Sequence, residues 1–174
     1  MTKPTSKIDQ LILQLRSDKM TDALAAVKEL KKHGNSKAIE PLLSTWIKNS
    51  ENILGDAIEK LLHNLKDTEG AYLLINQAKT TTDEEIRPRI LACLWNAGID
   101  CSDHLLDLVN IAVNSEYLTA VECMTIIENM EGPFEETQIM ESLISLRLAL
   151  QQETDSKPIY QVLLQHLEEV ERKQ

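Results

Sequence analysis

Residues 23–49 read ALAAVKELKKHGNSKAIEPLLSTWIKN. Apolar residues recur at intervals of three or four before Gly34 and again after it, which is the spacing of one buried helix face. Glycine readily adopts the left-handed conformation that ends many helices, so Gly34 is expected to stop the first helix. The stretch therefore predicts two amphipathic helices joined by a short turn.

The turn position recurs along the chain. Gly34, Asp67, Gly98 and Gly132 are separated by 33, 31 and 34 residues, and each lies between two amphipathic patterns. Such a period, with two helices per unit, is typical of a helical repeat array. No stretch shows sustained alternation of apolar and polar residues, so no sheet is expected.

These patterns predict an all-α fold, a right-handed α-α superhelix (an α-solenoid) built from antiparallel helix pairs. A single domain is expected over residues 1–174, because no long linker separates the helical patterns. The expected repeats span roughly residues 17–49, 50–81, 82–114 and 115–150, with capping helices at roughly 5–16 and 156–172.

Two segments of the chain resemble HEAT repeats, particularly the short bacterial variety. One is residues 23–49, and the other is DEEIRPRILACLWNAG at residues 83–98, where Pro88 lies at a common HEAT kink site and is expected to bend its helix. The likeness covers roughly residues 17–132, and Gly55 stands at a position where the second repeat lacks such a proline. The resemblance implies a scaffold that binds other macromolecules. The repeat itself carries no catalytic residue, although base-excision glycosylases and tetrapyrrole-attaching lyases of this family have acquired sites on it.

The resemblance also implies that the second helix of each pair lines the concave surface. The outward polar side chains of these helices are the candidate binding residues, namely Lys37, Ser44, Lys48, Tyr72, Asn76, Lys79, Asp107, Asn110 and Asn114. Asn and Tyr are more informative here than Lys or Glu, because long charged side chains occupy any hydrated surface. A plain solvated face is the alternative interpretation of the same residues.

The chain is acidic, and its charge is uneven. Lys and Arg number 18 against 28 Asp and Glu, a net charge of −10, of which residues 1–66 hold +3 and residues 67–174 hold −13. Nucleic-acid affinity depends on basic groups that neutralise phosphates, so DNA or RNA is not expected as a partner. The expected partner is another protein, a basic one if charge steers the encounter, and a homo-oligomer is a further option.

The leading hypothesis is a non-enzymatic, protein-binding scaffold that uses the concave surface of a HEAT-like solenoid. One rival is a nucleic-acid or nucleotide-acting HEAT-type protein, because Lys28, Lys31, Lys32 and Lys37 form a basic patch near the first turn. A second rival is an accessory lyase or ligand carrier with a pocket between helices.

No sequence motif indicates catalysis. The chain lacks a glycine-rich phosphate loop, a GxSxG elbow, an HExxH helix and paired Cys motifs, so neither a catalytic residue nor a cofactor is expected. Metal-ligand residue types are densest at Asp100, Cys101, Asp103, His104 and Asp107. Acidic residues favour the start of a helix for electrostatic reasons, so this cluster is interpreted as a helix start and no metal is expected.

Several large or sulfur-containing residues fall on apolar helix faces. Trp46, Trp95 and Ile144 are expected in the core. A role as binding anchors is the alternative interpretation of the two tryptophans, because tryptophan dominates interface hot spots. Cys93 and Cys123 are expected to be buried as small apolar side chains.

The composition also bears on location. The three cysteines have no CxxC spacing, and the segment MTKPTSKIDQ is polar rather than an apolar leader. The apolar stretches fall far short of the ~20 residues that span a bilayer. A cytoplasmic protein with no membrane partner is therefore expected.

Overall fold

The computed structural model describes residues 6–65 and 68–173. Within these ranges the chain is all-α, with 76% of it helical and no strand. None of the helices in the described ranges is long and apolar enough to cross a membrane. Asp67, and residue 5 at the start of the first expected capping helix, lie outside the described residues.

Contacts between Cα atoms divide the chain into two compact units, Met1–Leu73 (unit 1) and Leu74–Gln174 (unit 2). The boundary falls inside α5 (Thr68–Thr80), and each unit is described by itself. The single domain expected from the sequence stays a prediction.

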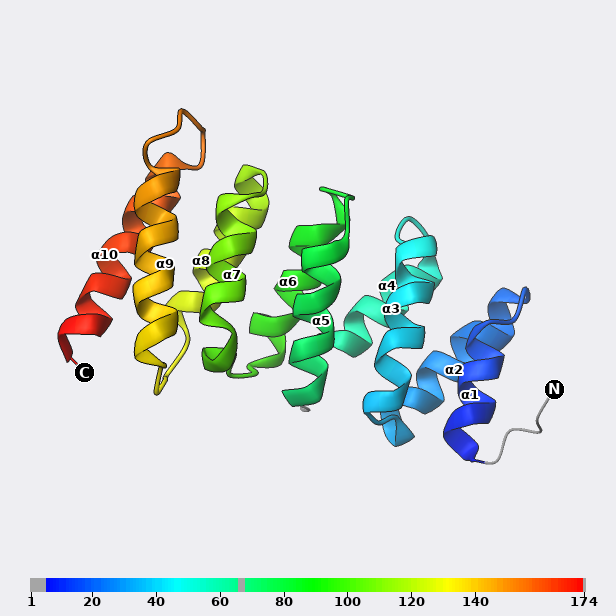
Figure 1. Ribbon diagram of the computed structural model, residues 1–174. Helices are drawn as coiled ribbons and strands as arrows, with labels where there is room; N and C mark the ends of the chain where they lie inside the picture. Colours follow the sequence, from blue (N-terminus) through cyan, green and yellow to red (C-terminus); the bar gives the residue numbers. More distant parts are fainter. Residues whose placement is uncertain (1–5, 66–67, 174) are drawn as a thin grey trace. The chain divides into compact units, whose positions relative to one another are not determined.

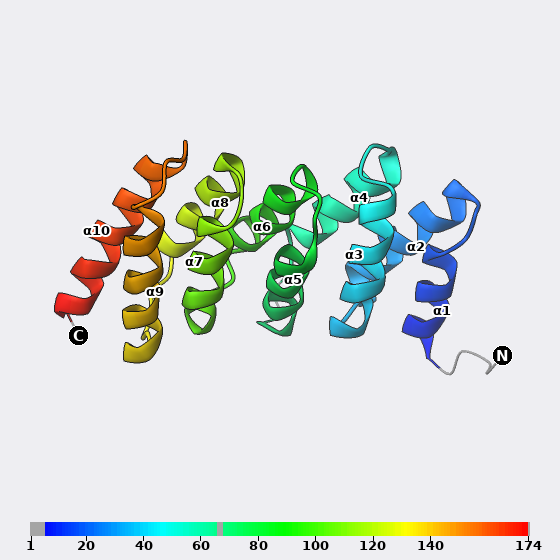
Figure 2. The same cartoon turned by 45° about the horizontal axis from the view of Figure 1, so that its top comes forward.

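Unit 1 has two layers of helices. Its remaining elements are α1 (Lys7–Leu15), α2 (Met20–His33), the 3₁₀ helix η1 (Ser36–Ala38), α3 (Ile39–Lys48) and α4 (Ile53–Leu62). Helix α1 packs against α2 and α3, and α4 packs against the same two helices. Helices α1 and α3 lie in one layer, with α2 and α4 behind them (Figure 1, Figure 2). The core between the layers includes Leu15, Trp46, Ile58 and Leu62, all buried.

Unit 2 repeats this layering. After the end of α5 it contains α6 (Ile86–Ala97), the 3₁₀ helix η2 (Ser102–His104), α7 (Leu105–Val113), α8 (Tyr117–Glu128), α9 (Glu136–Ala149) and α10 (Lys157–Lys173). Helix α7 packs against α9, and α8 packs against α6 and α10. Contacts of α7 with α8 and of α9 with α10 join the two layers (Figure 1, Figure 2).

The glycine turns differ in conformation. Gly98 has a φ of 64° and Gly132 a φ of 76°, so both lie in the left-handed region that favours glycine. The expectation of a left-handed Gly34 is wrong, because its φ of −67° and ψ of 155° are extended. The chain leaves α2 extended because the next residue starts η1, where the Asn35 side chain accepts a hydrogen bond from the Lys37 N–H.

The bend expected at Pro88 depends on where α6 begins. Asp83 Oδ1 accepts hydrogen bonds from the N–H groups of Glu85 and Ile86 and supplies the cap. Pro88 is therefore the third helical residue rather than an interior one. A proline in the first turn of a helix removes no intrahelical hydrogen bond, because the N–H groups there have no acceptor within the helix. Pro88 therefore gives no physical reason for the expected bend.

The two tryptophans have different environments. Trp46 is fully buried, which confirms the core prediction. The same prediction is wrong for Trp95, whose side chain is 44% exposed. Its indole N–H donates to Glu122 Oε2 at 2.8 Å, so α8 supplies a polar partner at the surface.

Candidate functional site

The nine candidate binding residues are distributed over both units. Unit 1 holds Lys37 in η1, Ser44 and Lys48 on α3, and Tyr72 on α5, whereas unit 2 holds Asn76 and Lys79 on α5, Asp107 and Asn110 on α7, and Asn114 at its C-cap. All nine are exposed or half-buried. Their outward orientation follows from the apolar periodicity, which assigns the other positions of each helix to the core.

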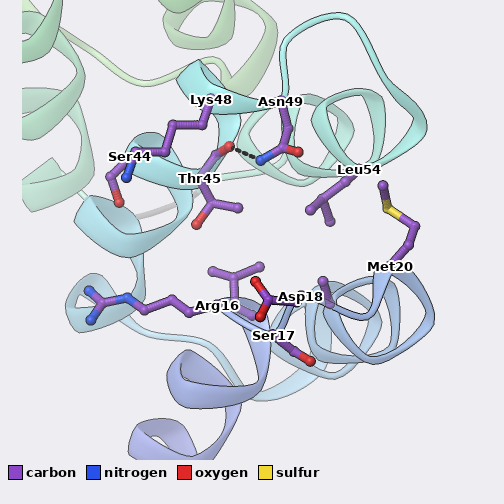
Figure 3. A pocket seen from close by; sticks show the side chains of 11 residues that line it. Arg16, Ser17, Asp18, Met20, Ser44, Thr45, Lys48, Asn49 and Leu54 are labelled. Carbon is purple, nitrogen blue, oxygen red and sulfur yellow. Dashed lines mark hydrogen bonds between the residues drawn. The ribbon is translucent and has the colours of Figure 1, made fainter.

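A cavity of about 660 Å³ in unit 1 brings two of them together. Ser44 and Lys48 on α3 face the turn between α1 and α2, which contributes Arg16 and Asp18 (Figure 3). Met20 lines the opposite end of the cavity from Lys48. Neither Arg16 nor Asp18 could be identified from helix periodicity, because both lie in a turn.

The upper wall of this cavity is fixed by hydrogen bonds at the end of α3. Asn49 Nδ2 donates to the Thr45 carbonyl oxygen at 2.8 Å, as Figure 3 shows. Asn52 Nδ2 donates to Asn49 Oδ1 at 2.9 Å, and Asn52 Oδ1 accepts from the Leu54 N–H at the start of α4. These side-chain contacts fix the α3–α4 turn, which begins directly after Lys48.

A second cavity, of about 260 Å³, brings four candidate residues together in unit 2. Lys79, Asp107, Asn110 and Asn114 all line it, together with Arg87. Lys79 Nζ lies 2.6 Å from Asp107 Oδ1, so an ion pair connects α5 to α7 across the cavity. We call this the α7 cavity.

The two asparagines of the α7 cavity also have structural contacts. Asn114 Nδ2 donates to the Asn110 carbonyl oxygen at 2.8 Å, which satisfies a carbonyl at the end of α7. Asn110 Oδ1 accepts from Ser145 Oγ at 3.3 Å and so links α7 to α9. Asn110 therefore has a fixed orientation in the cavity wall.

The surface of α9 holds a feature that the sequence argument missed. Ile144, expected in the core, is 52% exposed, and that expectation is wrong. Met140 is 51% exposed and Leu148 57% exposed, and the three side chains lie four residues apart on one helix face. We call Met140, Ile144 and Leu148 the α9 stripe.

One lysine of the basic patch, Lys32 on α2, is paired with a carboxylate. Glu29 lies 3.1 Å from Lys32 Nζ and 3.9 Å from both Lys7 Nζ and His33 Nε2. The hydrogen bond and charge of Lys32 lower the pKa of the Glu29 carboxyl. Phosphate binding requires cations without such partners, so Glu29 weakens this patch as a nucleic-acid surface.

The cysteines are all buried, which confirms the expectation for Cys93 and Cys123. Burial, with a smaller contribution from the Asp100 charge, raises the pKa of the Cys101 thiol to about 12. Burial likewise raises the pKa of Cys123, with the Glu122 charge adding to the shift. Both thiols therefore stay protonated near neutral pH, and a thiol reacts as a nucleophile only when it is ionised.

We expect a thiol titration to reflect this burial. With the folded chain at pH 8, a disulfide reagent such as dithionitrobenzoate should label fewer than one thiol per chain within minutes, because all three thiols are buried and the raised pKa values of Cys101 and Cys123 suppress their ionisation. In guanidinium chloride all three cysteines of the sequence should react at once. Rapid labelling of Cys101 in the folded chain would contradict the burial of its thiol.

Residue types that can bind a metal are densest from Asp100 to Asp107, around the start of α7. Among the residues that the structure describes, no group of three or more His, Cys, Asp and Glu side chains could hold a metal ion. Asp107 instead pairs with Lys79, and its other oxygen lies 3.6 Å from His104 Nδ1. Asp100 accepts a hydrogen bond from Ser102 Oγ at 2.6 Å.

Comparison with protein-family models, with curated proteins and with solved structures gives no match. The functional conclusion therefore depends on the α7 cavity, the α9 stripe, the unit 1 cavity and the distribution of charge.

Proposed function

We propose that the chain is a HEAT-like, right-handed α-solenoid of antiparallel helix pairs and that it is a non-enzymatic module that binds another, basic protein. The contact surface in this proposal is formed by the second helices of the pairs, α7 and α9 in unit 2. One observation carries the proposal. Lys79, Asp107, Asn110 and Asn114, which helical periodicity alone places facing outward, line a single cavity.

The helix packing within each unit supports the repeat interpretation. In unit 1 α1 contacts α3 and α2 contacts α4, and in unit 2 α7 contacts α9 and α6 contacts α8. Each helix therefore packs against the equivalent helix of the next pair, which is how stacked repeats bury a continuous core. Stacking of this kind leaves one face of every layer available for binding.

The distribution of charge supports a basic partner. Unit 2 contains 7 Lys and Arg against 18 Asp and Glu, a net charge of −11. A surface of one sign accelerates the encounter with a partner of the opposite sign and disfavours partners of the same sign. The protonated, buried Cys101 and Cys123 thiols fit a binding role better than covalent catalysis.

We expect the Asp107→Lys variant to lose the partner. The substitution places two lysines where Lys79 and Asp107 now form an ion pair, so it turns a neutral pair into two adjacent positive charges at the centre of the α7 cavity, which repel a basic partner. The immobilised wild-type chain should capture one stoichiometric basic protein from cytoplasmic extract at about 50 mM salt and retain part of it at about 150 mM. Asp107→Lys should capture about tenfold less.

Glu128→Lys is the matched control, because Glu128 is an exposed carboxylate at the end of α8 in the other layer of the same unit. It changes the net charge by the same amount and should leave capture within about twofold. Capture of no stoichiometric protein at either salt concentration counts against the proposed function. Equal loss in both variants would show that the overall charge of unit 2, and not the α7 cavity, holds the partner.

A further inference from the structure

The α9 stripe is an apolar surface that unit 2 leaves uncovered. The buried residues of α9, Ile139, Ser142, Leu143 and Leu146, face the helices that it contacts, α7 and α10. The stripe lies on the opposite side, with each of its three side chains more than half exposed. Single exposed aliphatic residues are ordinary on protein surfaces, whereas three aligned on successive turns form a contiguous apolar patch of the kind that interaction sites use.

Acidic side chains border the stripe. Glu136 and Glu141 are exposed on the same helix, and Glu141 is adjacent in sequence to Met140 and one turn before Ile144. The basic residue of α9, Arg147, already contacts Glu168 of α10 at 2.9 Å. No ion pair of Glu136 or Glu141 occurs within the described ranges, so a partner that covers the stripe meets negative charge along its edges, which selects for lysine or arginine at the edges of the partner surface.

The geometry of the stripe fits a helix. Eight residues separate Met140 from Leu148, which is about 12 Å along the axis at 1.5 Å per residue. An amphipathic helix presents apolar residues at matching intervals of three and four, and it needs about three turns to cover this length. An extended strand gains its affinity by adding to a sheet edge, and the described residues contain no sheet.

A cavity at the Leu148 end of the α9 stripe makes the two ends of the docking site different. It has a volume of about 330 Å³, lies between α7 and α9, and includes Leu148, Ser145 and Asn110 in its lining. Most of the lining is polar, so a lysine at one end of the partner helix can enter with its aliphatic stem beside Leu148, and Ser145 and Asn110 are already hydrogen-bonded to each other. Such a pocket at the end of an apolar stripe is suited to one anchoring side chain.

A second copy of the chain is a poorer occupant. Two unit 2 surfaces, each with a net charge of −11, would bring Glu136 and Glu141 of one copy against those of the other. Like charges across an interface disfavour the complex. We propose that the α9 stripe docks one basic amphipathic helix of a partner protein, with lysine or arginine on its polar face; this rests on the proposed function and specifies the partner surface.

The test uses a synthetic probe rather than an unknown partner. The probe is a fluorescent peptide of about 18 residues that places leucine on one helical face and lysine on the other. Its anisotropy is titrated with the full-length chain at about 150 mM salt, alongside a second peptide in which glutamate replaces every lysine. The lysine peptide should bind in the micromolar range, and the glutamate peptide should not bind.

Two chain variants test the location of the binding site. Ile144→Ser with Leu148→Ser should weaken lysine-peptide binding about tenfold or more. Leu118→Ser is the matched control, because Leu118 is 66% exposed on α8 of the same unit, and it should change binding by less than about twofold. Both variants remove exposed side chains, and circular dichroism together with thermal melting confirms that each remains folded.

Equal binding by the wild type and the double variant would overturn the proposal, as would an equal effect of Leu118→Ser. Failure of the lysine peptide to bind, or binding of the glutamate peptide, would overturn it too. Growth of the wild-type particle in light scattering that the double variant abolishes would identify a second copy as the occupant and also overturn it. Capture of a partner that depends on Asp107 with no peptide binding would leave the proposed function standing and reject the α9 stripe as its docking site.

Discussion

Replacing Arg87 with alanine is expected to lower the free energy of unfolding by about 3–5 kcal/mol. Arg87 lies in the first turn of α6 and is only 9% exposed. Its Nε donates to the Ala78 carbonyl oxygen at 3.1 Å, and its Nη1 donates to Ser115 Oγ at 3.1 Å. The same guanidinium contacts the Thr81 carbonyl oxygen and the Glu84 carboxylate.

The expected loss of stability is large because removing the Arg87 side chain leaves several polar groups without their hydrogen-bond donor. Without Arg87, the Glu84 carboxylate and the carbonyl groups of Ala78 and Thr81 lose their donor at a partly buried position. Leaving one partner of a buried ion pair behind is far more destabilising than never having had the pair. Arg87 also lines the α7 cavity, so the variant should weaken the scaffold that holds Lys79 and Asp107.

Arg147→Ala is the matched control for this measurement. Arg147 is exposed and makes one ion pair with Glu168, so its loss should cost less than about 1 kcal/mol. Arg87→Lys retains the charge but cannot reach several acceptors in different directions, and should be intermediate. Urea denaturation followed by circular dichroism measures all three, and equal losses for Arg87→Ala and Arg147→Ala would show that Arg87 makes no net buried contribution.

The helices were predictable because apolar periodicity reports which side of each helix is buried. The same local signal is insufficient at the helix ends. Gly34 and Gly98 both follow an amphipathic helix, yet Gly98 is left-handed whereas Gly34 is extended. The difference comes from the next residues, because Asn35 begins a 3₁₀ turn by accepting the Lys37 N–H.

The polar residues of α5 and α7 could be placed facing outward from the sequence. The apolar positions of an amphipathic helix take its buried side, so the polar positions lie on its exposed side. That Lys79, Asp107, Asn110 and Asn114 share a cavity could not be predicted, since it depends on how α5 and α7 approach each other within unit 2. Arg87 was missed for the same reason. A charged residue suggests solvent exposure, and the burial of Arg87 depends on acceptors at residues 78, 81, 84 and 115.

The exposure of the α9 stripe could not be predicted, because an apolar residue such as Ile144 gives the same sequence pattern whether or not a neighbouring helix covers it. The apolar residues of α9 are distributed around most of its circumference, and the sequence alone does not indicate how many helices pack against it. In the structure α7 and α10 contact α9 and bury Ile139, Leu143 and Leu146. The residues of the α9 stripe stay exposed. This apolar helix face that no helix of unit 2 covers is the observation that suggests binding.

Gly55→Ala is expected to destabilise the protein by about 2–3 kcal/mol, although alanine favours a helix over glycine by about 1 kcal/mol. Gly55 is the third residue of α4 and is buried against the end of α3. A Cβ added there would collide with the Asn49 carbonyl oxygen and lie 2.8 Å from the Asn49 carbonyl carbon. Backbone atoms cannot move aside as a flexible side chain can, so the whole α3–α4 turn must shift.

That shift would disturb the hydrogen bonds of Asn49 and Asn52, which hold the end of α3 and the edge of the unit 1 cavity. Gly98→Ala tests backbone strain without a steric collision, because no atom lies within 4 Å of a Cβ added at Gly98, whereas the φ of 64° is unfavourable for alanine. It should cost about 1 kcal/mol, clearly less than Gly55→Ala in the same urea titration. A Gly55→Ala variant as stable as the wild type would mean that α4 does not approach Asn49 so closely, and the geometry of the unit 1 cavity would then be wrong.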